Sequence, residues 1–268
     1  MSHQFAKKCS FASSIHEQLE TDAFIQQLSQ TTTFHAVPPH RMSLAVLEEI
    51  CDRTDIITLS RNEHLDLLSH GDCLFEILSG YVKICDPPEP NNGTNEGEPA
   101  LLAWRIPGEL LGDFRFAQPE VSGNDRITAT DECRLLRMPT PLIHELAVLF
   151  PQIYLNIARN LASKARKAGI RAQILRIGTL RGKVAQLFLS LIAERKTSEE
   201  GPGQHVLNGT FRVDELAAFI GYEERSTGGV ISELRSQGLI EHFNNQLSGR
   251  YEIRDEAGLK TYLDRHMT

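Results

Sequence analysis

The stretch FRVDELAAFIGYEERSTGGVISELRSQGLI, residues Phe211–Ile240, decides the interpretation of this chain. Its apolar residues recur at helical spacing on both sides of Gly221, which predicts one helix over Val213–Ile220 and a second over Glu223–Gln237. Gly221 suits the turn between them because glycine enters left-handed backbone space at little cost. The pattern predicts a helix-turn-helix, whose second helix would enter the major groove of DNA.

The residues that follow strengthen this interpretation. Glu241–Ile253 has the pattern of a strand, an Asn/Ser/Gly-rich turn and a second strand. A helix-turn-helix followed directly by a hairpin is a winged helix, which favours DNA binding. The alternative is an ordinary hairpin of two helices in a helical domain.

Size and composition predict a globular protein of two domains. The chain has 268 residues, of which 41% are hydrophobic and 24% charged. No stretch approaches the roughly 20 apolar residues that span a bilayer, and the N-terminus lacks the apolar core of a secretory signal. The cysteines form no CxxC pair, which fits reduced thiols, so we expect a cytoplasmic location. They are Cys9, Cys51, Cys73, Cys85 and Cys133.

The net charge of −7 is unevenly distributed along the chain. Residues 1–150 hold 11 Lys/Arg and 22 Asp/Glu, a balance of −11, whereas residues 151–268 hold 17 and 13, a balance of +4. Only the C-terminal half therefore suits the approach to phosphates. The basic run between Arg159 and Lys183 is either a solvated helix face or a weak attraction toward the duplex.

Four segments follow from the patterning, in an α+β fold. Residues 1–40 are a polar N-terminal extension without an assigned function, and residues 41–150 form a β-barrel or jelly-roll domain of short strands. Residues 151–178 form a long helix, and residues 179–268 form the winged helix-turn-helix domain, with a polar loop over Lys196–Asn208. The expected strands are Ile56–Leu59, His64–Leu68, Leu74–Leu78, Tyr81–Ile84, Ala100–Trp104 and Cys133–Met138.

The long helix carries an apolar stripe that a solitary helix would leave uncovered. Pairing with the same helix of a second chain would bury the stripe in a coiled coil and make a homodimer through residues 151–178. Packing against the chain's own β domain is the alternative, and the two arrangements are compatible. The stripe comprises Ile153, Ile157, Leu161, Ala165, Ala168 and Ala172.

Several strings, taken in order, resemble the CRP/FNR family of bacterial transcription regulators. They are Gly71-Asp72 followed by LFEILSGYVKI, then RIPGELLGDF (Arg105–Phe114), RITATDECRLLRM (Arg126–Met138), FPQIYLNIARNLASKAR, GKVAQLFLSLIAER and the helix-turn-helix. The resemblance implies a cyclic-nucleotide-binding-like sensor domain, a homodimer, and promoter DNA and RNA polymerase as partners.

The resemblance also indicates the position of an effector pocket, and at this position the chain differs from the family. Gly112-Asp113 stands where cyclic-nucleotide members have Gly-Glu, and Gly123-Asn124 stands where they have the phosphate-binding Arg-Ser. Arg126 comes three residues late, and Ala168-Gly169 replaces the hydroxyl pair that contacts the base. An anionic phosphate without its guanidinium loses its strongest partner, so the sequence argues against cyclic AMP as the effector.

Metal cofactors are not expected either. An iron–sulfur cluster needs well-spaced thiolates, and Cys9 stands far from the next cysteine. His64, His70 and Cys73 form a loose group that could ligate haem or zinc, but ordinary surface or hydrogen-bonded side chains are the preferred interpretation. Cys133 fits a small core residue better than a redox sensor.

The second helix departs from the family's Ser-Arg-Glu-Thr pattern, which predicts a different target sequence. Arg225 suits guanine or phosphate, and Ser226 and Thr227 suit either. Gly228-Gly229 weakens the helix and removes one base-reading side chain, while Glu223 and Glu224 repel phosphates unless they accept from cytosine. Backbone contacts are expected from Arg212, Arg235, Asn244, Asn245 and Arg250. The candidate DNA-binding residues are thus Arg212, Glu224, Arg225, Ser226, Thr227, Gly229, Arg235 and Arg250.

Two functions remain open at this point. The first is a homodimeric transcription regulator that reads a two-fold symmetric site. The second is a barrel-domain sensor or interaction protein whose degenerate helix-turn-helix does not bind DNA. The chain has no nucleophile elbow, phosphate loop, HExxH or paired-acid spacing, so an enzyme is not expected.

Overall fold

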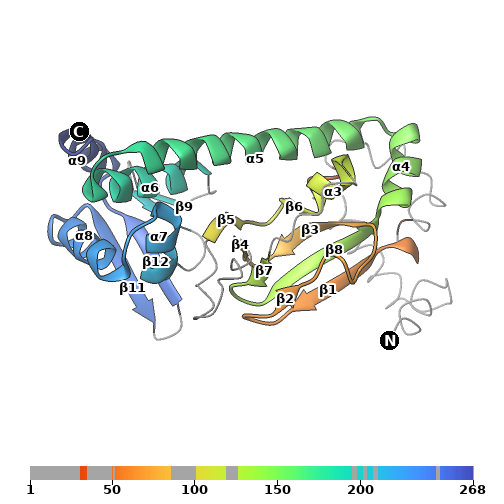
Figure 1. Cartoon of the computed structure of the whole chain (residues 1–268), viewed down its shortest axis with the longest axis horizontal. Helices are drawn as coiled ribbons and strands as arrows, with labels where there is room; N and C mark the ends of the chain where they lie inside the picture. The colour runs from red at the N-terminus through yellow and green to blue at the C-terminus, as the bar shows by residue number, and fades with distance from the viewer. Residues whose placement is uncertain are drawn as a thin grey trace, which may run out of the picture. The chain divides into compact units, whose positions relative to one another are not determined.

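The computed structural model describes residues 31–34, 50, 52–85, 101–118, 126–194, 198–201, 204–207, 211–245 and 248–267. The chain divides into two compact units, Met1–Lys83 with Trp104–Ser163, and Ile84–Ala103 with Lys164–Thr268 (Figure 1). The boundary between Ser163 and Lys164 falls inside helix α5 (Gln152–Arg176). Most of the predicted N-terminal extension, residues 1–40, lies outside the described residues.

Short antiparallel strands build the β domain, as the sequence predicts. One four-stranded sheet has the order β1-β8-β3-β6 and another the order β2-β7-β4-β5. Strands β6 and β7 are not among the strands expected from the patterning, although the segment Arg126–Met138, which contains β7, resembles strands of the family. The strands are β1 (Asp55–Leu59), β2 (His64–Leu65), β3 (Cys73–Ser79), β4 (Val82–Cys85), β5 (Leu101–Arg105), β6 (Leu110–Leu111), β7 (Arg126–Ala129) and β8 (Cys133–Pro139).

One turn of this domain requires glycine. Gly80, between β3 and β4, has a φ of 81°, and a Cβ there would lie 2.4 Å from the carbonyl oxygen of Glu132. Both the left-handed backbone and the close approach exclude a side chain. Gly80 therefore allows β3 and β4 to connect tightly beside the start of β8.

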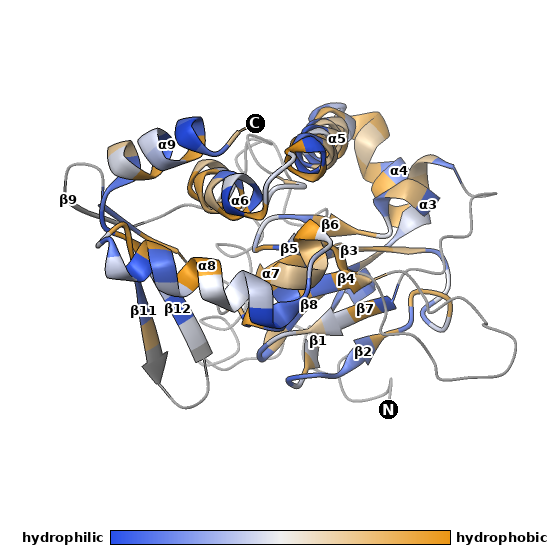
Figure 2. Ribbon diagram, turned by 60° about the vertical axis from the view of Figure 1, so that its left-hand side comes forward, coloured by the Kyte–Doolittle hydropathy of each residue, from blue (hydrophilic) through white to orange (hydrophobic). Residues whose placement is uncertain are grey.

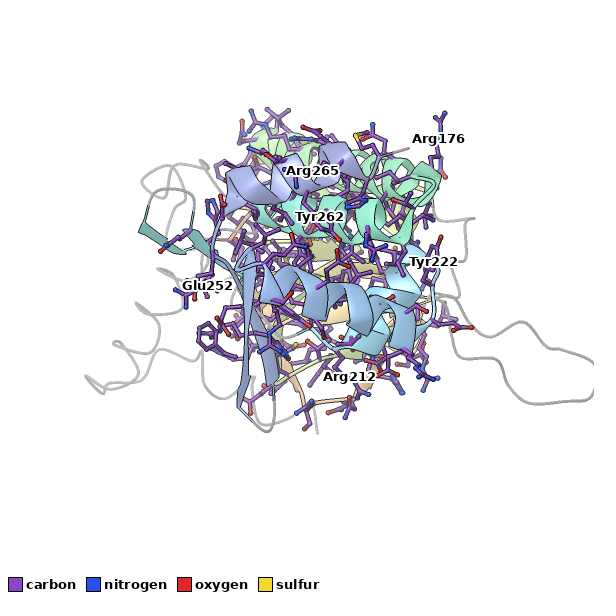
Figure 3. The ribbon with its side chains drawn as sticks, turned by 90° about the vertical axis from the view of Figure 1, so that its left-hand side faces the viewer. Arg176, Arg212, Tyr222, Glu252, Tyr262 and Arg265 are labelled. Carbon is purple, nitrogen blue, oxygen red and sulfur yellow. The ribbon has the colours of Figure 1, made fainter. Side chains whose placement is uncertain are left out.

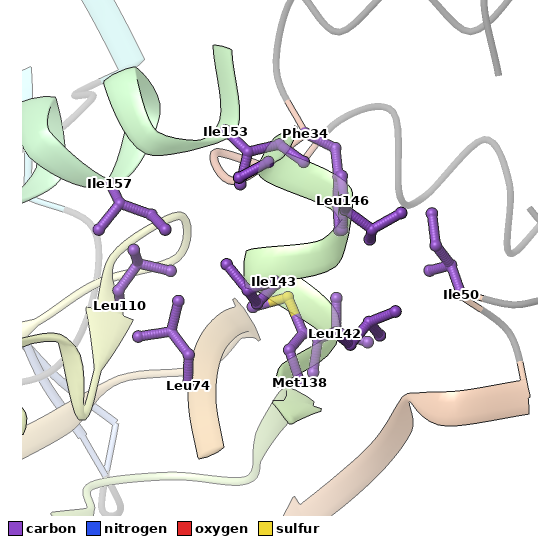
Figure 4. Close-up of a cluster of buried hydrophobic side chains, with 12 residues drawn as sticks. Phe34, Ile50, Leu74, Leu110, Met138, Leu142, Ile143, Leu146, Ile153 and Ile157 are labelled. Carbon is purple, nitrogen blue, oxygen red and sulfur yellow. The ribbon is translucent and has the colours of Figure 1, made fainter. Parts of the chain in front are cut away.

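The main apolar core of the first unit joins the sheet β1-β8-β3-β6 to two helices. Leu74 and Leu110 from the strands pack with residues of α4 (Thr140–Leu149) and with Ile153 and Ile157 of α5 (Figure 4). Phe34, from the predicted N-terminal extension, belongs to the same cluster. Burial of such side chains stabilises each by about 1.5–3 kcal/mol, so this core fixes the first turns of α5.

The second unit contains the predicted winged helix and three elements that were not predicted from the sequence, β9, β10 and α9. Helices α7 (Val213–Ile220) and α8 (Glu224–Ser236) confirm the predicted helices to within one residue at each end, and helix α6 (Leu180–Glu194) precedes them. Strands β11 (Ile240–Asn245) and β12 (Ser248–Ile253) form the predicted hairpin.

The expectation of a polar loop over Lys196–Asn208 is wrong. This segment contains β9 (Ser198–Gly201) and β10 (Gln204–Val206), which extend the wing to the order β11-β12-β10-β9. Pairing with β12 gives the backbone of the polar strand β10 its hydrogen-bond partners. The residues of β10 itself carry no local pattern that predicts this pairing.

Helix α9 (Glu256–Arg265) was also missed, although the sequence contains its signals. Asp255 caps it by accepting from the N–H of Gly258 at 2.8 Å, and Leu259, Tyr262 and Leu263 are buried. Among the described residues, no helix combines the length and apolarity needed to cross a membrane.

Candidate nucleic-acid interface

The helix-turn-helix is positioned by burial of one face of each helix. Leu216, Ala217 and Ile220 of α7 are buried, as are Val230, Ile231 and Leu234 of α8. Between the helices, Gly221 has the left-handed φ of 72° that the sequence predicts. Figure 2 shows the mixture of hydrophobic and hydrophilic residues along α8 that follows from this one-sided packing.

Most of the predicted contact residues of α8 are exposed. Glu224, Arg225, Ser226 and Gly229 are exposed. Arg235 is also exposed and lies 3.9 Å from Glu241, a weak surface ion pair. These positions leave a guanidinium and a hydroxyl, Arg225 and Ser226, on one surface of the helix.

Thr227 does not belong to that surface, which corrects the sequence analysis. Its side chain is 0% exposed, and its Oγ1 has no hydrogen-bond partner among the described residues. Thr227 precedes the buried Val230 and Ile231 by one helical turn, so it points into the packed side of α8. A direct contact of this hydroxyl with DNA would need α8 to leave its place.

The paired glycines of α8 are not explained by packing. A Cβ on Gly228 would meet Val213 Cγ1 at 3.6 Å, which is ordinary contact, and a Cβ on Gly229 would meet no described atom within 4 Å. Neither glycine has a positive φ. The surface at Gly229 is therefore open, at a cost of about 1 kcal/mol of helix propensity.

The arginines predicted to contact the DNA backbone have different surroundings. Arg212 precedes α7 and pairs with Asp214, with Nη2 2.8 Å from Oδ2, and its hydrogen bonds to Asp214 raise its pKa. Figure 3 shows Arg212 below α8 in that view. Arg250 is exposed on β12. Asn244 and Asn245 end β11, but their side chains lie outside the described parts.

A hollow of about 450 Å³ lies beside α8. Within it, Arg181 Nε donates to Glu233 Oε2 at 2.9 Å, and the Tyr262 hydroxyl donates to Glu233 Oε1 at 2.9 Å. Burial raises the pKa of Tyr262 to about 12, and the bond to Glu233 adds to this. The hollow is lined by Thr179, Leu180, Arg181, Ser226, Gly229, Val230, Glu233 and His266.

Arg181, Tyr262 and His266 were missed as neighbours of α8. Arg181 belongs to the basic run seen in the sequence, and the last residues of the chain have no predicted role. Figure 3 shows Tyr262 above α8, on α9. Only the return of α9 to α6 brings Tyr262 and His266 to this position, where the Thr179 hydroxyl also donates to the His266 carbonyl.

Some described residues of the predicted effector pocket are buried and others are exposed. Gly112 has a φ of 81° before helix α3 (Asp113–Ala117), and Asp113 is buried. Arg126 is exposed, with its guanidinium on the Nε2 of His64, whose Nδ1 lies 2.8 Å from Thr128 Oγ1. Gly123 and Asn124 lie outside the described residues.

The remaining two pocket candidates, Ala168 and Gly169, are exposed on α5. In the loose His/Cys group, Cys73 and His64 form hydrogen bonds with neighbouring residues of the protein. Cys73 Sγ donates to the carbonyl of His70 at 3.2 Å, and His64 engages Arg126 and Thr128. No metal-holding group of His, Cys, Asp or Glu occurs among the residues that the structure describes.

The apolar stripe predicted on α5 is partly buried within this chain and partly exposed. Ile153 and Ile157 are buried within this chain, which supports packing of part of the stripe on the chain itself. The exposed side carries residues at alternating spacings of three and four, here called the small-residue seam. The seam consists of Leu155, Ala158, Ala162, Ala165, Gly169 and Ala172.

No protein-family model and no curated protein sequence matches this chain. Solved structures do. A mutant of CooA from Carboxydothermus hydrogenoformans superposes with a TM-score of 0.65 at 15% identity, covering 88% of this chain and 97% of that one. A CRP/FNR-family transcriptional regulator from Thermus thermophilus gives 0.55 at 22% identity, covering 79% and 100%.

A third neighbour is the c-di-GMP responsive global regulator CLP of Xanthomonas campestris. It superposes with a TM-score of 0.58 at 14% identity, covering 80% of this chain and 99% of that one. The resemblance seen in the sequence is confirmed at the level of architecture: a β domain, a long helix and a winged helix in one order. The chain has the fold of the CRP/FNR transcriptional regulators.

Proposed function

We propose that this chain is a sequence-specific DNA-binding transcription regulator that acts as a homodimer. The observation that carries the proposal is the exposed face of α8, with Arg225 and Ser226 on the outside of a packed winged helix. A guanidinium pairs with guanine through two parallel hydrogen bonds, and a hydroxyl bonds bases or phosphates. Such a role is not enzymatic, and its site of action would be cytoplasmic promoter DNA.

The charge distribution supports approach to DNA by one part of the chain. Residues 151–268 have a balance of +4, against −11 for residues 1–150. Arg225, Arg235 and Arg250 are exposed in the second unit. The overall acidity would keep nonspecific binding weak and make recognition depend on direct contacts.

The small-residue seam supports the homodimer. Alternating spacings of three and four place its residues along one side of α5, and alanine and glycine permit close approach of a second helix. Analytical ultracentrifugation tests this with Ala165→Glu, which places a charge in the seam and should yield monomers. Ser163→Glu adds the same charge on α5 outside the seam and should leave the dimer intact.

For the effector, we propose a ligand other than cyclic AMP. Arg126, the cation nearest the missing Arg-Ser pair, is exposed and engaged with His64. A neighbour with this fold is described as c-di-GMP responsive, so the fold accommodates other signals. Calorimetry with cyclic AMP tests the proposal, and micromolar binding would contradict it. RNA polymerase is the proposed partner at the promoter.

The alternative is a sensor or interaction protein that does not bind DNA. Glu223 and Glu224 at the start of α8 favour it because they repel phosphates, and the bare surface at Gly229 favours it because a contact is lost. Capture of genomic fragments by the purified protein at low salt decides between the two. Failure of the wild-type protein to bind any fragment would support the alternative.

A captured site then allows a sharper test. Arg225→Ala should weaken binding to that site by about 1–3 kcal/mol, because one bidentate base contact is lost. Fluorescence anisotropy at fixed salt measures the change. Arg61→Ala, which removes an exposed arginine of the first unit, is the matched control and should bind as the wild type does.

A further inference from the structure

The segment Thr31–Phe34 is packed into the first unit rather than extended from it. Phe34 is 3% exposed and belongs to the core cluster of α4, α5 and the strands. Figure 4 shows Phe34 next to Ile153 and Leu146. Thr31 and Thr33 are also buried. A segment that the sequence analysis left without a function therefore contributes to the core beneath the first turns of α5.

A single carboxylate binds the backbone of this segment. Glu76 of β3 is 1% exposed; the N–H of Thr32 donates to its Oε1, and the N–H of Thr33 donates to its Oε2 at 3.0 Å. Burial raises the pKa of Glu76, and the bonds from Thr33 and Thr32 oppose the rise. A buried carboxylate is costly without such donors, so the segment and Glu76 depend on each other.

The same segment is bonded to α5. Asn156, which is buried, donates from Nδ2 to the carbonyl of Thr33 at 3.1 Å. One turn later, Asn160 Nδ2 donates to the carbonyl of Gly108 at 3.1 Å, and its Oδ1 accepts from the N–H of Leu110. Asn156 and Asn160 thus join one face of α5 to the segment and to the turn before β6.

The turn at Gly108 also contacts the segment. Gly108 has a φ of 85°, and a Cβ there would lie 2.9 Å from Thr32 Oγ1. The segment, β3, this turn and α5 therefore meet at one place, with polar contacts between buried groups. Such contacts act together because loss of one leaves the others unpaired in a low-dielectric interior.

We propose that Thr31–Phe34 is a strap that fastens the first turns of α5 to the β domain, with Glu76 as its anchor. Release of the strap frees these turns. Leu155 and Ala158 of the small-residue seam are exposed in the same turns, in which Asn156 is buried. In the proposed homodimer, the state of the strap would therefore influence the interface between the two chains.

Hydrogen exchange of the full chain, followed by mass spectrometry, tests the strap. In the wild type, the amides of Thr32 and Thr33 should exchange slowly. Glu76→Gln keeps the side-chain size but leaves one accepting oxygen for two donors. It should accelerate exchange of the strap by about tenfold or more, and exchange of residues 152–160 should rise with it.

Glu145→Gln is the matched control, because Glu145 is an exposed carboxylate of the same unit that pairs with Arg53. This variant should leave the exchange rates of the strap and of residues 152–160 unchanged. Asn156→Ala is the second variant, for the case that Glu76→Gln does not fold. It removes the bond from α5 to the strap, together with the bonds that Asn156 Oδ1 accepts from Gln152 and Arg159. It should accelerate the exchange of the strap and of residues 152–160.

Two results would overturn the inference. One is free exchange of Thr32 and Thr33 in the wild-type protein. The other is a variant in which the strap exchanges faster while residues 152–160 remain protected. Neither readout uses DNA, so a wild-type protein that shows the strap but binds no DNA would refute the proposed function alone.

Discussion

Polar side chains have opposite uses in the two compact units. In the first unit, Glu76, Asn156 and Asn160 are buried and bonded to backbone groups of the same chain. On α8 of the second unit, Arg225 and Ser226 are exposed. These polar groups of the first unit bind its own chain, whereas those of α8 are exposed at the surface that the proposed function assigns to DNA.

The largest expected effect tests whether the two units are also separate in stability. Leu74 and Leu234 are fully buried, one in each unit, so truncation of either to alanine should cost about 2–5 kcal/mol. Trp104, the single tryptophan, lies in the first unit. In urea, Leu74→Ala should shift the unfolding transition of the first unit, which tryptophan fluorescence reports. Leu234→Ala should leave that transition in place and shift only the unfolding of the second unit, which circular dichroism reports.

An equal shift of the tryptophan transition by Leu234→Ala would break the comparison. It would mean that the two units unfold as one cooperative structure, because truncation in one would then destabilise both. Leu68→Ala, at an exposed leucine of the first unit, is the control and should change neither transition.

Thr227→Val should stabilise the second unit by about 1 kcal/mol, because it replaces a buried hydroxyl without a described partner by a methyl group. DNA affinity should be unchanged, unlike the effect of Arg225→Ala. Thermal unfolding and anisotropy measure the two quantities. A large loss of affinity in Thr227→Val would restore Thr227 as a contact residue and contradict its buried position.

Arg181→Ala should reduce DNA affinity a few-fold at moderate salt. Arg181 lines the hollow beside Ser226 and Gly229, with 51% of its side chain exposed. Loss of one phosphate contact lowers the slope of log affinity against log salt by about 0.9. A salt series checks this, with Arg265→Ala on α9 as the control. An unchanged slope would limit Arg181 to its bond with Glu233.

The smallest expected effect is a loss of stability at acidic pH, to which one histidine of each unit contributes. Burial lowers the pKa of His242 from 6.5, and Arg235 lowers it further. The unfolded chain therefore binds more protons than the folded one as the pH falls below 6.5, and stability is lost in that direction. Burial likewise lowers the pKa of His64 in the first unit.

His242→Phe should reduce the acid sensitivity of the second unit only. Phenylalanine keeps a ring against Tyr251, on which His242 stacks with centroids 4.4 Å apart, and it cannot titrate. Thermal unfolding at neutral and mildly acidic pH measures the difference. If the variant keeps the full loss of stability at acidic pH, other groups are responsible for it.

The sequence alone determined the elements whose signals are local. Helices α5, α7 and α8 were predicted to within two residues at each end because helical periodicity and Gly221 act over a few positions. The β domain was predicted as a class, and Arg225 and Ser226 were predicted as surface residues of α8. Helix α9 was missed despite its cap and its spaced apolar residues.

Only the tertiary structure decided which polar residues are buried and what they bind. Thr227 and Ser226 are adjacent hydroxyl residues of similar chemistry, and packing alone buries one and exposes the other. Glu76 and Thr32 are 44 positions apart, and β10 exists because β12 pairs with it. Such contacts depend on the folded path of the whole chain, because hydrogen bonds between distant residues leave no periodic trace in the sequence.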